Sequence, residues 1–126
     1  MPATLKIELL DCRLSVCRYA EVPEGLPREG FLSVTRTGDE VSVVCETGRA
    51  PSGPQACEDG WSALKVLGPL DFSLVGILAG ISTMLAEAGI PLFALSTYDT
   101  DYILVKEGDL RSAIEALRAG GCEVAP

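Results

Sequence analysis

Residues 69–105 decide the fold. They begin Pro69-Leu70-Asp71-Phe72-Ser73-Leu74-Val75-Gly76-Ile77-Leu78-Ala79 and end Phe93-Ala94-Leu95-Ser96-Thr97-Tyr98-Asp99-Thr100-Asp101-Tyr102-Ile103-Leu104-Val105. Apolar residues at spacings of three and four predict a helix over 72–88, with Asp71 as N-cap and Gly89 as the C′ glycine. Two apolar stretches, 91–96 and 101–106, then predict a hairpin with a polar turn. A helix N-terminus favours anions and carboxylates favour cations, so the segment is suited to a free amino acid, which carries both charges.

The elements expected around this segment complete a known pattern. A strand over 61–67 precedes it, a second helix starting at 108–109 and stopped by Gly120-Gly121 follows it, and 122–124 form a last short strand. The order β-α-β-β-α-β predicts an α+β, ferredoxin-like sandwich with both helices on one face of an antiparallel sheet.

The first half of the chain predicts mainly strands. Alternating apolar residues give a strand over 4–10, which either resumes or is followed by a second strand near 14–16. A hairpin is expected over 31–46, and 48–60 is interpreted as a linker because it combines proline and glycine without periodicity. We therefore expect two tandem units, 1–60 with reduced helix content and 61–126 complete.

The composition excludes several classes of function. The 126-residue chain carries ten Lys and Arg against eighteen Asp and Glu, a formal net charge of −8, which argues against binding of nucleic acids or anionic membranes. It contains no histidine, so serine–histidine and cysteine–histidine catalysis and most catalytic zinc sites are excluded. We expect no catalytic residue, no metal site and no cofactor.

The five cysteines form no C-x-x-C pair. Cys17, Cys45 and Cys122 stand in or beside apolar stretches, where reduced thiols behave as small hydrophobic groups; a redox or metal role is the alternative. Reduced thiols and the absence of a visible targeting segment predict a cytoplasmic protein.

The carboxylates of Asp71, Asp99 and Asp101 allow several interpretations. Two of them could serve acid–base catalysis or bind magnesium. Alternatively, Asp71 caps the helix and Asp99 forms the turn. In a third interpretation, Asp99 or Asp101 binds the ammonium or guanidinium group of a ligand, and the carboxylate of that ligand lies at the helix N-terminus.

The residues 72–79, 85–90 and 93–105 closely resemble the second unit of small tandem ACT-domain proteins, which are similar to the regulatory domains of aspartate kinase and to cytosolic arginine sensors. Residues 5–7, 14–16 and 31–46 extend the resemblance, more weakly, over most of the chain.

The resemblance implies a non-catalytic, amino-acid-binding regulatory protein that pairs into a homodimer or higher homo-oligomer through its sheets. It implies ligand contacts from the loop entering the first helix and from the following hairpin. The residues concerned are Leu70, Asp71, Phe72, Ser73, Leu74, Gly76, Thr97, Tyr98, Thr100 and Asp101. A ligand-free interaction or oligomerisation module is the alternative.

Overall fold

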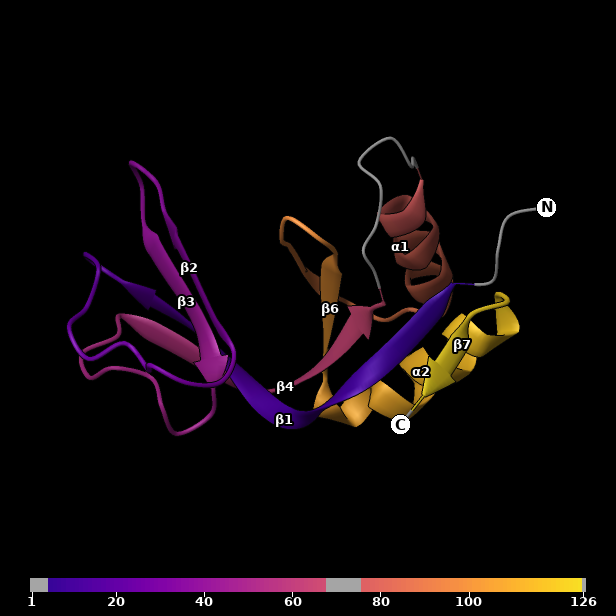
Figure 1. Ribbon diagram of the computed structural model, residues 1–126, viewed down its shortest axis with the longest axis horizontal. Coiled ribbons are helices and arrows are strands. Elements are labelled where there is room, and N and C mark those ends of the chain that lie inside the picture. Colours follow the sequence, from indigo (N-terminus) through magenta and orange to yellow (C-terminus); the bar gives the residue numbers. More distant parts are fainter. Residues whose placement is uncertain (1–4, 68–75, 126) are drawn as a thin grey trace. The chain divides into compact units, whose positions relative to one another are not determined.

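The computed structural model describes residues 5–67 and 76–125. The elements follow one another as β1 (Lys6–Tyr19), β2 (Leu32–Arg36), β3 (Val41–Glu46), β4 (Ala56–Val66), α1 (Ile77–Glu87), β5 (Phe93–Ser96), β6 (Asp101–Lys106), a 3₁₀ turn (Glu107–Asp109), α2 (Leu110–Ala119) and β7 (Glu123–Ala125). Figure 1 shows these elements along the chain.

The chain divides into two compact units. The helical unit consists of Met1–Asp11 and Ser62–Pro126, and the strand unit consists of Cys12–Trp61. This division differs from the predicted domains, 1–60 and 61–126, because the first residues of the chain belong with the C-terminal unit. Strands β1 and β4 each contribute residues to both units.

The helical unit has the expected order β4-α1-β5-β6-α2-β7. Its strands are ordered β7-β1-β4-β6-β5, so the beginning of β1 lies between the first and last strands of the βαββαβ unit. β1 pairs in parallel with β7, and Ile7 is the partner of Val124. The ferredoxin-like fold is confirmed, and the added strand was not predicted.

One hydrophobic cluster joins both helices to the sheet of this unit. Ile81 and Leu85 from α1 and Ala113 and Leu117 from α2 are buried in it. The strand residues of the cluster alternate along their strands, so both helices cover the same face. These residues are Ile7, Leu64, Val66, Ile103, Val105 and Val124.

Both helices end in the same hydrogen-bonded motif. After α1, the Gly89 N–H donates to the Ala86 carbonyl and the Ile90 N–H donates to the Leu85 carbonyl, each at 2.9 Å. Gly89 has φ of 75°, a left-handed conformation that glycine adopts without strain. This is the Schellman arrangement, and it places Ile90 in the core. The predicted C′ glycine is confirmed.

The strand unit contains only strands and turns within residues 12–61. Its strand order is β2-β3-β1-β4, and the predicted hairpin is confirmed as β2 and β3, with Val34 opposite Val43. Its core consists of Cys17, Tyr19, Val41, Val43 and Cys45.

Two boundaries were predicted wrongly. Residues 56–60 belong to β4 and not to a linker. This polar stretch is held by its partners on β1: the Ser15 hydroxyl donates to the Asp59 carboxylate at 2.5 Å, and the Gln55 N–H donates to the Arg18 carbonyl at 2.7 Å. The first helix begins at Ile77, with Gly76 as its left-handed N-cap, so it does not run unbroken through residue 76 as predicted. Residues 72–75 of the predicted helix, and Asp71, its predicted N-cap, lie outside the described residues.

Candidate functional site

The tip of the β5–β6 hairpin contains four of the predicted site residues, Thr97, Tyr98, Thr100 and Asp101, and all four are described. Ser96 is the cross-strand partner of Asp101, and 97–100 form the turn between them. The Thr97 N–H donates to the Thr100 carbonyl at 2.8 Å, and the Thr97 hydroxyl accepts from the Thr100 N–H at 3.3 Å. The turn is therefore closed by its own threonines.

Thr100 fixes this turn to the neighbouring strand. Its side chain is buried, with 6% of its surface exposed, and its hydroxyl donates to the carbonyl of Val66. Val66 is the last residue of β4, and residues 67–76 separate β4 from α1 in the sequence. The turn is thus held beside the point where the chain leaves β4 for the first helix, and the Thr100 hydroxyl is occupied by a structural bond.

The other hairpin residues are more accessible. Tyr98 is 81% exposed. Asp101 is partly exposed, and its carboxylate accepts a hydrogen bond from the Ser96 hydroxyl at 2.6 Å. This bond orients the Asp101 carboxylate at the start of β6. Among the four predicted hairpin contacts, Asp101 therefore offers an oriented, partly exposed negative charge.

The helix entry is described from Gly76 onward. Leu70, Asp71, Phe72, Ser73 and Leu74 lie outside the described residues, and their predicted contacts stay predictions. Gly76 has φ of 83° and precedes a helix with no side-chain cap and no acidic residue in its first turn. The first N–H groups of a helix lack partners within it, so this end has the chemistry of an anion site.

The cysteines correct the expectation of reduced thiols. Cys17 and Cys57 form a disulfide between β1 and β4, while Cys12, Cys45 and Cys122 are free. Burial, and secondarily the Glu46 carboxylate, raises the pKa of the Cys45 thiol, and burial raises the pKa of the Cys122 thiol. Both are therefore protonated at neutral pH and poor nucleophiles. Neither the sequence spacing nor the composition indicated the disulfide.

The described part of the chain shows neither a cluster of metal ligands nor a membrane-spanning helix. Within residues 5–67 and 76–125, no group of three or more Asp, Glu or Cys side chains lies close enough together to hold a metal ion. Within the same residues, neither helix is long and apolar enough to cross a membrane.

The fold and the order of its elements match a known domain. A family model of the ACT domain matches residues 56–119. The chain belongs to the ACT-domain family. ACT domains are regulatory, ligand-binding domains, and this chain carries one. A second family model, of an N-terminal domain, matches residues 12–53, most of the strand unit.

Solved structures support the assignment. The crystal structure of a protein from Agobacterium tumefaciens is 32% identical with a TM-score of 0.88, and the match covers 98% of this chain and 94% of that chain. A Vibrio cholerae protein of unknown function, described as a possible transport protein, is 23% identical with a TM-score of 0.74 over 94% of this chain and 91% of that chain.

The ligand-free regulatory subunit of aspartate kinase from Thermus thermophilus is 9% identical, with a TM-score of 0.64 over 90% of this chain and 95% of that chain. At this identity the likeness concerns the fold. The predicted similarity of this ACT-domain protein to aspartate kinase regulatory domains is confirmed at that level.

Proposed function

We propose that this chain is a non-catalytic regulatory protein that binds a free amino acid at its helical unit. The observation that carries the proposal is the hydrogen bond from Thr100 to Val66, which holds the hairpin tip beside the strand end that leads into α1. The amino acid's carboxylate would accept from backbone N–H groups at the start of α1, near Gly76. Its ammonium group would lie against Asp101.

The charge distribution supports this assignment of the two ends of the ligand. The first turn of α1 has no carboxylate to compete with a bound anion. Asp101 is oriented by Ser96, and an oriented carboxylate loses less side-chain entropy when it binds a cation. Binding would favour one arrangement of the protein over another, and a partner protein would respond to the change.

Thermal unfolding in the presence of each of the twenty amino acids tests the proposal. A ligand at about one hundred times its dissociation constant adds roughly 2.7 kcal/mol to the stability, which raises Tm by roughly 10 °C in a chain of this size. The absence of a shift with every amino acid at millimolar concentration would contradict it.

A matched pair of variants tests the role of Asp101. Asp101→Asn removes the charge but keeps an oxygen that accepts from Ser96, so it should abolish most of the shift. Asp99→Asn removes an exposed charge from the same turn and should leave the shift unchanged. Equal effects of the two substitutions would contradict the assignment of Asp101.

A second candidate function is oligomerisation without a ligand. β2 is at the edge of the strand order, and Leu32 and Val34 on it are 39% and 38% exposed. Exposed edge strands pair with other chains, and a lysine prevents this. Val34→Lys should convert an oligomer into monomers in sedimentation experiments, whereas Leu67→Lys, at a leucine of the helical unit that is 38% exposed, should not. An unchanged mass for Val34→Lys would exclude this edge as the interface.

A further inference from the structure

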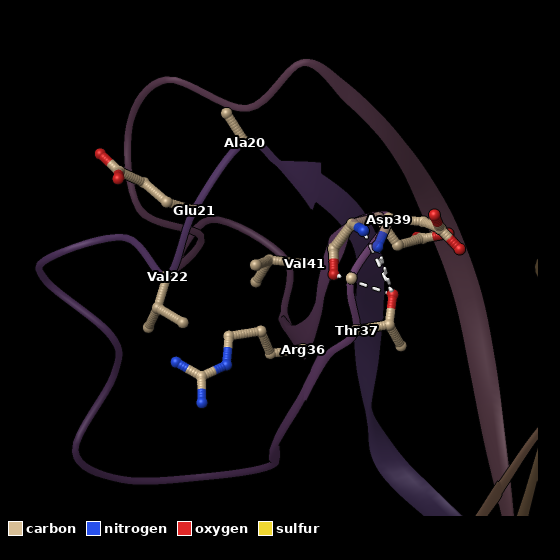
Figure 2. A pocket seen from close by; sticks show the side chains of 9 residues that line it. Ala20, Glu21, Val22, Arg36, Thr37, Asp39 and Val41 are labelled. Carbon is tan, nitrogen blue, oxygen red and sulfur yellow. Dashed lines mark hydrogen bonds between the residues drawn. The ribbon is translucent and has the colours of Figure 1, made fainter.

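The strand unit contains a hollow of about 390 Å³, far in the sequence from the hairpin of the proposed amino-acid site. It is formed by the residues that follow β1, by the end of β2 and by the β2–β3 turn (Figure 2). Its volume falls within the range of small-molecule sites. The lining residues are Ala20, Glu21, Val22, Arg36, Thr37, Gly38, Asp39, Glu40 and Val41.

The turn that forms one wall is fixed by its own hydrogen bonds. The Thr37 hydroxyl accepts from the Asp39 N–H at 3.1 Å and from the Glu40 N–H at 3.2 Å, and the Thr37 N–H donates to the Glu40 carbonyl at 2.9 Å. Figure 2 shows the bonds from the hydroxyl as dashed lines. The wall is therefore formed before a ligand arrives, which lowers the entropy cost of binding.

Arg36 supplies a positive charge that the described residues leave unneutralised. Its guanidinium makes no hydrogen bond or ion pair with any side chain or carbonyl of residues 5–67 and 76–125. The nearby Arg18, in contrast, lies 4.0 Å from the Glu40 carboxylate and donates to the Asp39 carbonyl at 3.5 Å. In Figure 2 the carboxylates of Glu21 and Asp39 point away from the Arg36 guanidinium. The acidic lining therefore does not occupy this arginine.

An apolar surface lies next to the same guanidinium. Val22 is 43% exposed, and its side chain faces Arg36 in Figure 2. Val41 lines the hollow as well, but it is 3% exposed, so Val22 supplies the accessible apolar surface. A guanidinium binds a carboxylate through two parallel charge-assisted hydrogen bonds, while Val22 favours an aliphatic group.

We propose that this hollow is a second ligand site, specific for a small organic carboxylate with a short branched aliphatic chain. The carboxylate binds Arg36 and the aliphatic chain covers Val22. This second site is separate from the proposed amino-acid site and does not depend on it.

Titration of the full-length, ¹⁵N-labelled protein with isovalerate, followed by NMR, tests this inference. The expected dissociation constant is on the order of 1 mM. We expect shifts confined to the amides of 20–22 and 36–41, while a ligand at the proposed amino-acid site would shift 96–101 instead. If the amide chemical shifts of residues 20–22 and 36–41 do not change, the inference is overturned, regardless of any change at residues 96–101.

Three comparisons establish which groups recognise the ligand. Arg36→Gln should weaken binding at least tenfold, and Arg36→Lys should weaken it less because the charge remains. Arg28→Gln removes an exposed arginine outside the hollow and should leave binding unchanged. Isovaleramide, the neutral analogue, should not bind. Equal affinity for the amide, or an unchanged affinity in Arg36→Gln with a folded spectrum, would overturn the inference.

Discussion

Replacing Thr100 by valine should lower the free energy of unfolding by about 2 kcal/mol. Thr100 is 6% exposed and its hydroxyl donates to the Val66 carbonyl, whereas valine keeps the shape of the side chain and lacks the donor. A buried hydrogen bond contributes about 1 kcal/mol net, and an acceptor left without its partner in the interior raises the total cost to roughly 1–3 kcal/mol.

The chain offers a matched control in Thr83→Val. The Thr83 hydroxyl also donates to a backbone carbonyl, that of Ala79 at 2.9 Å, but it does so on the exposed surface of α1. Water replaces the lost donor there, so the free energy of unfolding should change by less than about 0.5 kcal/mol.

Urea unfolding followed by far-UV circular dichroism measures both variants. With a slope of about 2 kcal/mol per molar urea, the midpoint of Thr100→Val should fall by about 1 M and that of Thr83→Val by less than about 0.3 M. Equal midpoints for the two variants would refute the reasoning, because the Thr100 hydroxyl would then not hold the hairpin and would be available to a ligand.

Three further substitutions have expected outcomes. Cys57→Ser removes the disulfide to Cys17, which spans a sequence separation of 40 residues. Chain entropy predicts that the free energy of unfolding, measured in urea, falls by about 4 kcal/mol. As a check on the disulfide itself, the denatured, unreduced wild type should titrate with three free thiols, not five. Gly120→Ala places a Cβ 2.5 Å from the Met84 sulfur and should lower the stability by about 1–2 kcal/mol in the same assay; an unchanged midpoint would show that Met84 moves freely. Cys122→Ala should reduce the loss of stability above about pH 8.5, because burial raises the pKa of this thiol and the unfolded state therefore releases its proton first; parallel stability–pH curves would contradict this.

The parts of the fold that were predicted correctly depend on local signals. Gly89 ends α1 because the C′ position needs a left-handed residue, and that requirement is visible in the sequence. The turn 37–40 and the turn 97–100 likewise follow from polar residues between apolar strands. In each case the interactions join residues only a few positions apart.

The parts that were missed depend on residues distant in the sequence. Residues 56–60 are polar and aperiodic, and they form a strand because Ser15 and Arg18 bind the chain beside them. The disulfide between Cys17 and Cys57 likewise depends on the pairing of β1 with β4, which no local pattern of the sequence reveals. In the candidate site, the resemblance pointed to Thr100 as a ligand contact, but its bond to Val66 could not be predicted without the strand order.

The placement of β1 beside β7 has a consequence for folding during synthesis. Lys6 pairs with Glu123, so the helical unit can complete its sheet only when residue 123 has left the ribosome. The strand unit, Cys12–Trp61, is contiguous and can form earlier. Until then the first strand has unpaired backbone groups along one edge, a state that favours aggregation. A fragment that begins at residue 61 would lack this interior strand permanently, so the ACT domain of this protein cannot be excised at its apparent boundary.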